Sequence, residues 1–153
     1  MNILITLDEN YFPRLRVLLT SLKMNDPGEH FDIYLLYSGL SERMLRAVER
    51  WCRAAGYEFH PIRMDGDLFE NAPVSSRYPT EMYYRLLASR LLPQELNRII
   101  YLDPDILVIN PLRPLWETNM SGWLFGAAAH TGKTELANDV NRLRLGVEHD
   151  YYN

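Results

Sequence analysis

Residues 1–64 alternate short apolar runs with longer amphipathic segments, and no other feature restricts the fold as much. The apolar runs cover residues 3–7, 31–37 and 57–64, and each has the length and composition of a buried strand. Segments with apolar residues at helical spacing separate them. Strands joined in this way by helices form a parallel sheet with right-handed crossovers. The sequence therefore predicts an α/β fold with a mainly parallel central sheet and flanking helices.

Both amphipathic segments carry signals that start and end helices. The first helix is predicted to begin near Tyr11, because Pro13 is tolerated only in a first turn, and to end before residues 26–28. Ser41 is placed to cap the second helix, and Gly56 to end it. The predicted core-facing residues are Phe12, Leu15, Leu19 and Leu22 in the first helix and Met44, Leu45, Val48, Cys52 and Ala55 in the second.

The rest of the chain is predicted from weaker signals. Residues 65–79 are polar and contain two prolines, so we expect a loop there. A third helix is expected over residues 80–92, a fourth strand over 98–102 and a fifth over 123–129. Residues 1–153 are expected to form a single domain.

Composition excludes several classes of function. The net charge of −4 and the lack of a basic block argue against nucleic-acid binding, because clustered Lys and Arg hold phosphate backbones. No segment approaches the ~20 apolar residues of a membrane span, and the N-terminus lacks a secretory pattern. The single cysteine, Cys52, is predicted to be a buried core thiol, which fits a reducing compartment. The predicted location is the cytoplasm, including the inner face of a membrane.

Two aspartates, Asp103 and Asp105, close the predicted fourth strand in the stretch RIIYLDPDILVINPL. Ligands of open α/β sheets bind beyond the carboxyl ends of strands, where Asp8 also lies. In extended backbone, which Pro104 favours for Asp103, the two carboxylates would project to the same side. Carboxylates ~4 Å apart repel by about 4 kcal/mol at an effective dielectric constant of about 20, and Mg²⁺ or Mn²⁺ relieves this repulsion. The alternative is that both carboxylates cap a turn and face water.

Six stretches, taken in order along the chain, resemble the motifs of family 8 glycosyltransferases. They are ILITLDENY, FDIYLLYSGLSE, MYYRLL, IIYLDPDILVINPLRPLW, GWLFGAAAH and YYN. This family comprises retaining enzymes that use nucleotide-sugar donors, among them glycogenin and the bacterial lipopolysaccharide galactosyl- and glucosyltransferases. The resemblance implies the GT-A fold, a Rossmann-like nucleotide-diphospho-sugar transferase fold, with residues 1–153 as the N-terminal part of a longer catalytic domain. It favours the metal-binding interpretation of the aspartate pair.

The resemblance implies roles around the donor's diphosphate and sugar. Asp103 and Asp105 would chelate Mn²⁺, or Mg²⁺, which binds the diphosphate, and Pro104 would lie against the donor. Arg85 would reach the sugar or the diphosphate, where a guanidinium pairs well with oxyanions. Its alternative is a solvated surface arginine. Asn153 would lie near the sugar.

The resemblance also implies a nucleotide pocket formed by Thr6, Asp8, Asn10 and Tyr11. Asp8 would address the base, because a carboxylate accepts the imino proton of uracil, and Tyr11 would stack on it. The donor is therefore predicted to be a UDP-sugar. The alternative for Tyr11 is an aromatic residue that packs at a helix start.

The sequence departs from the family pattern at two places. His130 stands where an acidic residue is expected after the fifth strand, and a structural histidine is the simpler interpretation. A His-x-x-Gly-x-x-Lys motif, whose histidine is the family's third protein ligand to the metal, is not present. We therefore expect a donor-binding portion with little activity alone.

The predicted activity is transfer of a hexose from a UDP-sugar to an acceptor hydroxyl with retention of anomeric configuration, in lipopolysaccharide or polysaccharide biosynthesis. The acceptor is left open as a saccharide, a lipid-linked group or a protein, and no catalytic residue is assigned. The alternative is a non-catalytic interaction protein, or a fragment that self-associates through an exposed sheet face. A phosphohydrolase would need more ligands for a second metal, and a dehydrogenase would need Gly-x-Gly-x-x-Gly after the first strand.

Overall fold

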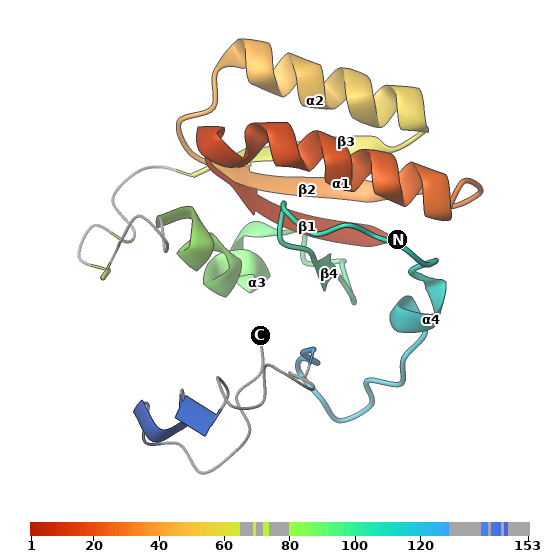
Figure 1. Cartoon of the computed structure of the whole chain (residues 1–153). Helices are drawn as coiled ribbons and strands as arrows, with labels where there is room; N and C mark the ends of the chain where they lie inside the picture. Colours follow the sequence, from red (N-terminus) through yellow and green to blue (C-terminus); the bar gives the residue numbers. More distant parts are fainter. Residues whose placement is uncertain are drawn as a thin grey trace. The chain divides into compact units, whose positions relative to one another are not determined.

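A computed structural model describes residues 1–64, 69, 72–73, 80–128, 139–140, 142–144 and 146. The chain divides into two compact units, Met1–Trp116 and Glu117–Asn153. The first unit contains a four-stranded parallel sheet with the strand order β3-β2-β1-β4 (Figure 1). Its strands are β1 (Asn2–Leu7), β2 (Asp32–Tyr37), β3 (Glu58–Arg63) and β4 (Ile100–Tyr101). The predicted α/β fold with a parallel sheet is confirmed.

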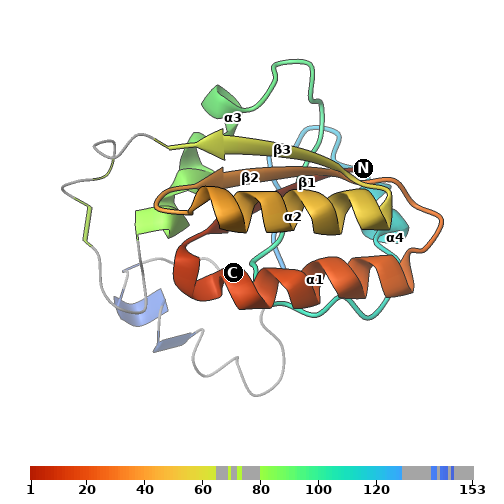
Figure 2. The same ribbon diagram turned by 90° about the horizontal axis from the view of Figure 1, so that it is seen from above.

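Two long helices cover one face of this sheet, as Figures 1 and 2 show: α1 (Phe12–Asn25), which follows the short 3-10 helix η1 (Glu9–Tyr11), and α2 (Glu42–Ala55). The predicted caps of α2 are confirmed. The Ser41 side chain accepts a hydrogen bond from the Met44 amide, and Gly56 ends the helix at a left-handed φ of 79°. Cys52, a residue of α2, is fully buried in the core, as predicted.

The opposite face of the sheet is covered by the 3-10 helix η2 (Thr80–Leu87) and the short helix α3 (Ala88–Leu91). The prediction of one regular helix over residues 80–92 is therefore wrong in its geometry. Contacts outside the segment explain the difference, because Tyr84 packs into the core and Tyr83 donates a hydrogen bond to the Pro73 carbonyl. Most of the loop predicted over residues 65–79 lies outside the described residues.

The last two predicted strands differ from the structure. β4 has only two residues, although the Leu102 amide extends its pairing by donating to the Leu4 carbonyl at 3.0 Å. The predicted strand at residues 123–129 is wrong over its described part, 123–128, where no strand forms. Trp123, Leu124 and Phe125 have most of their side-chain surface exposed. An apolar run becomes a strand only when another strand pairs with it, and none of the described strands does so here.

A one-turn helix, α4 (Arg113–Trp116), ends the first unit. None of the described helices combines the length and the apolar character needed to cross a bilayer.

Candidate functional site

The carboxyl ends of β1 and β4 meet at one edge of the sheet, because these strands are parallel neighbours. Asp8 directly follows β1, and Asp103 follows β4 after one intervening residue. Helix η2 brings Arg85 to Asp103, with Nη1 of the guanidinium 3.7 Å from Oδ1 of the carboxylate. The structure therefore joins two predicted site residues that are separated in the sequence.

Tyr101, which the sequence did not single out, lies at the centre of this group. Its hydroxyl is 2.8 Å from Asp103 Oδ1 and 3.1 Å from Thr6 Oγ1, and Arg85 Cζ lies 4.5 Å from the centre of its ring. Burial is the main cause that raises the pKa of Tyr101 to about 12, so the hydroxyl keeps its proton at neutral pH. A signal was present in the sequence, because residues two apart near a strand end share a side.

The aspartate pair lies in a turn. The Ile106 amide donates to the Asp103 carbonyl at 3.3 Å, which closes a turn with Pro104 and Asp105 at its centre. The extended backbone expected at the pair, with both carboxylates projecting to the same side, is therefore wrong, whereas the turn of the alternative interpretation is present. Proline favours the second position of such turns, and β4 ends before the pair. Pro104 is buried, whereas Asp105 is exposed.

The two oxygens of Asp103 have different surroundings. Tyr101 and Arg85 both approach Oδ1, whereas no hydrogen bond or ion pair from the described residues reaches Oδ2. Asp105 likewise has no such partner among the described residues. These oxygens fit a hard cation such as Mn²⁺ or Mg²⁺, which prefers carboxylate ligands.

Arg85 is held by three contacts. In addition to the ion pair and the stacking on Tyr101, its Nε donates to the Met82 carbonyl at 2.8 Å. It is therefore not a freely solvated surface arginine. Its charge lies beside Asp103, at the carboxyl ends of β1 and β4.

The Asp8 carboxylate organises the loop after β1. It accepts hydrogen bonds from the Tyr11 amide at 3.0 Å and from the Asn10 side chain at 3.1 Å, which caps η1. The Tyr11 ring is half-buried against the core, and Arg14 Cζ lies 4.3 Å from its centre. Thr6 is buried, with its hydroxyl on Tyr101. The roles of these residues toward a nucleotide stay predictions, as do those of His130 and Asn153, which lie outside the described residues.

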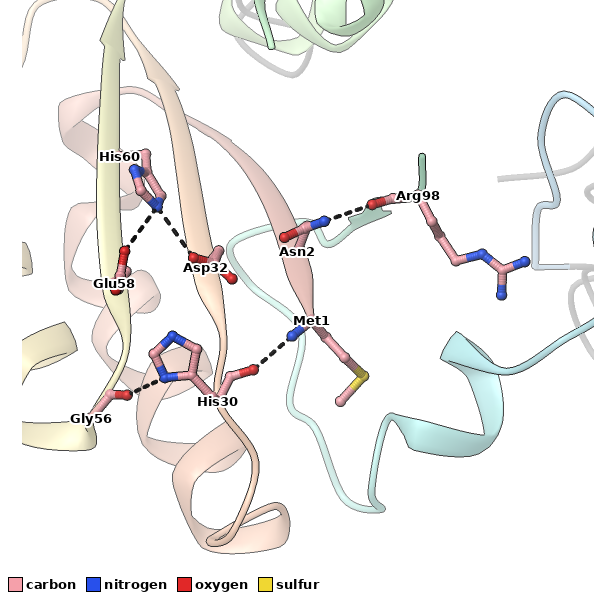
Figure 3. Close-up of polar contacts among 8 residues, drawn as sticks. All are labelled: Met1, Asn2, His30, Asp32, Gly56, Glu58, His60 and Arg98. Carbon is pink, nitrogen blue, oxygen red and sulfur yellow. Dashed lines mark hydrogen bonds and ion pairs between the residues drawn. The ribbon is translucent and has the colours of Figure 1, made fainter. Parts of the chain in front are cut away.

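A second group of metal-ligand side chains lies at the opposite edge of the sheet (Figure 3). Nε2 of His60 is 3.4 Å from Asp32 and 3.8 Å from Glu58, at the amino ends of β2 and β3. By the strand register Asp103 lies about four residues, or roughly 13 Å, beyond Asp32, and β4 is not a neighbour of β2, so the two groups cannot share an ion.

Comparison with known proteins identifies the family. The family model described as glycosyl transferase family 8 matches residues 2–153. The chain belongs to glycosyl transferase family 8. This family 8 chain is similar to General stress protein A of Bacillus subtilis (strain 168), with 26% identity over 92% of the chain. It is also similar to lipopolysaccharide 1,2-glucosyltransferase of Escherichia coli (strain K12), with 23% identity over 80% of the chain.

A solved structure of the galactosyltransferase LgtC, in complex with donor and acceptor sugar analogs, superposes on the whole of this family 8 chain. The TM-score is 0.86 at 26% sequence identity. LgtC has the GT-A fold, so the predicted fold is confirmed. This chain covers 55% of the LgtC chain, 50% of General stress protein A and 36% of the glucosyltransferase. It thus spans about half the length, or less, of these relatives.

Proposed function

We propose that this family 8 chain binds the UDP-sugar donor of a hexosyl transfer, with Mn²⁺ or Mg²⁺ held by Asp103 and Asp105. The observation that carries the proposal is the asymmetry of Asp103. Tyr101 and Arg85 hold Oδ1, while Oδ2 has no partner among the described residues. A carboxylate with one oxygen held by neighbours and the other oxygen free of them is well placed to act as a metal ligand. A cation also lets an anionic diphosphate approach two anionic side chains.

Each part of the UDP-sugar is assigned to the residues whose chemistry suits it. The bound cation would neutralise charge on the departing UDP. Arg85 would donate to the diphosphate or the sugar. Asp8 would accept the imino proton of uracil through lone pairs that its capping bonds leave free, and Tyr11 would stack on the base. The resemblance adds Thr6, Asn10, Pro104 and Asn153 to this set.

In the transfer itself, the acceptor oxygen would form a bond to the anomeric carbon as the bond to UDP breaks, with retained configuration. The proton of the acceptor hydroxyl would leave with the UDP phosphate. No residue of this chain is assigned as nucleophile. The acceptor would be a saccharide, a lipid-linked group or a protein, at the cytoplasmic side of a membrane. Lipopolysaccharide or polysaccharide synthesis fits the named activity of the Escherichia coli relative.

Calorimetric titration of the chain with UDP tests the donor site, with and without MnCl₂. We expect binding that needs the metal and that Asp103→Asn and Asp105→Asn each weaken at least about 10-fold. Asp32→Asn, at the opposite edge of the sheet, is the matched control and should leave UDP affinity unchanged. Binding of equal strength without metal, or unaffected by Asp103→Asn, would overturn the assignment.

A second function, self-association, is favoured by apolar side chains on the outer side of α1. Val17, Met24 and Leu107 are mostly exposed and line one shallow groove. This surface, rather than a sheet face, is the candidate interface, because both faces of the sheet are covered. Sedimentation velocity of the chain and of Val17→Glu tests it. A monomer at all concentrations would exclude this function.

A further inference from the structure

We infer that Tyr101 is a positioning residue that sets both Asp103 and Arg85 for binding of the donor. This inference rests on the proposed function. In this inference the Tyr101 side chain orients two neighbours: Asp103, the proposed metal ligand, and Arg85, the proposed cationic contact to the sugar donor. Its two parts, the hydroxyl and the ring, have separate tasks that separate substitutions can test.

The hydroxyl orients Asp103. A tyrosine hydroxyl has one hydrogen, and an ionised carboxylate can only accept, so the Tyr101 hydrogen points to Asp103 Oδ1 at 2.8 Å. The Thr6 hydroxyl, 3.1 Å away, must then be the donor to Tyr101. Two hydrogen bonds in series therefore run from Thr6 on β1 to Tyr101 on β4 and from Tyr101 to Asp103. It fixes the rotation of the carboxylate and keeps Oδ2 turned away from the hydroxyl.

The ring supports Arg85. The guanidinium lies over it with Cζ 4.5 Å from the ring centre, and its Nε is held by the Met82 carbonyl. A stacked guanidinium keeps its planar edge pointing in one direction. Here that edge faces Asp103, where Nη1 lies 3.7 Å from Oδ1. Tyr101 therefore fixes the distance between the positive and the negative group of the site.

Two substitutions at Tyr101 separate these tasks. Tyr101→Phe removes the hydroxyl and keeps the ring, whereas Tyr101→Leu removes both. Tyr34→Phe is the matched control, because Tyr34 is a buried tyrosine on the same sheet that contacts His60 rather than Asp103. Affinity for Mn²⁺ alone is measured from the loss of the free-ion signal in electron paramagnetic resonance. Stacking of Arg85 is measured in the metal-free protein from the ring-current shift of its Nε–H in NMR spectra.

We expect Tyr101→Phe to weaken Mn²⁺ binding about 10-fold and to keep the Arg85 ring-current shift. Tyr101→Leu should weaken Mn²⁺ binding similarly and abolish that shift, and Tyr34→Phe should match the wild type in both. If Tyr101→Phe does not fold, as judged by thermal unfolding, Thr6→Val replaces it. That substitution removes the donor to Tyr101 and should also weaken Mn²⁺ binding.

The outcomes distinguish this inference from the proposed function. If Asp103→Asn abolishes Mn²⁺ binding while Tyr101→Phe binds as tightly as the wild type, the donor site stands and the positioning role of the hydroxyl is overturned. If the wild type does not bind Mn²⁺, both fail. An Arg85 shift that survives Tyr101→Leu overturns the role of the ring.

Discussion

The Asp26 carboxylate accepts a hydrogen bond of 2.6 Å from the backbone amide of Leu112, 86 positions later in the chain. Asp26 is the C-cap of α1. Leu112 lies directly before α4, at the end of the segment that follows the turn at Asp103. The Ser21 hydroxyl accepts from the Val108 amide in the same region, at 3.0 Å. The segment after the candidate metal site is therefore anchored to α1 by buried side chains.

Asp26→Ala should lower the free energy of unfolding by about 2 kcal/mol, because it leaves the buried Leu112 amide without its charged acceptor. Urea denaturation measures this change. Hydrogen exchange should also speed up at residues 108 and 112. Glu49→Ala, which removes an exposed ion pair with Arg53, is the control and should change stability by less than about 0.5 kcal/mol. An equal effect of the two substitutions would show that the anchor contributes nothing.

Arg85→Lys should weaken Mn²⁺-UDP binding about 10-fold although the charge is kept. Lysine lacks the planar group that stacks on Tyr101 and the Nε–H that binds the Met82 carbonyl. Calorimetry with saturating Mn²⁺ measures the affinity. Arg46→Lys, in an exposed ion pair with Glu42 on α2, is the control and should have no effect. Unchanged affinity in Arg85→Lys would remove Arg85 from the donor site.

How far the sequence predicted the structure depends on how local the signals are. β1, α1, β2, α2 and β3 follow from apolar periodicity and from caps such as Ser41 and Gly56, which act within a few residues. The 3-10 geometry of η2 depends on packing by Tyr84 and on Tyr83 reaching Pro73, which no local pattern encodes.

In the candidate site, too, some features follow from local sequence signals and others depend on tertiary contacts. The aspartate pair and Arg85 could be predicted from their chemistry and from the family resemblance. The spacing of Tyr101 and Asp103 was a signal for their contact. The contacts of Tyr101 with Thr6 on another strand and with Arg85 on η2 could not be predicted, because they depend on the tertiary fold. Local signals did not decide the backbone at the pair, because proline favours both an extended residue before it and the second position of a turn. In the structure the Ile106 amide closes the turn.

Tyr57→Phe should leave the protein as stable or raise the free energy of unfolding by about 1 kcal/mol. The Tyr57 hydroxyl is the buried side-chain polar atom that has no hydrogen-bond partner among the described residues. Its ring packs edge to face on Phe31 with centres 5.1 Å apart, and phenylalanine retains this contact. Urea denaturation of both proteins tests the prediction. A loss of more than about 1 kcal/mol would mean that the hydroxyl has a partner.

Stability should decrease in alkaline solution. Burial raises the pKa of the Cys52 thiol from 9.0 to about 12 and, as the largest of three causes, that of Tyr57 from 10.0 to about 12. The folded state therefore holds these protons more tightly than the unfolded state. The resulting stabilisation is complete below pH 9.0 for Cys52 and 10.0 for Tyr57, and is lost as the pH rises toward 12.

The free energy of unfolding, measured from neutral pH to about pH 11, should decrease above the ordinary pKa values of these groups. Tyr57→Phe is the matched variant, because it removes one of the groups whose pKa burial raises and should flatten the profile in the upper part of this range. Identical profiles for the wild type and the variant would contradict the contribution of Tyr57.

The hydrogen bond between Thr6 and Tyr101 joins residues 95 positions apart. During synthesis β1 leaves the ribosome long before β4, and a contact of such separation forms only after the intervening chain has been ordered. We therefore expect the Asp103 edge to be assembled late in folding, after the β1-α1-β2-α2-β3 core. Binding of the sugar donor would then be possible only after β4 has paired with β1.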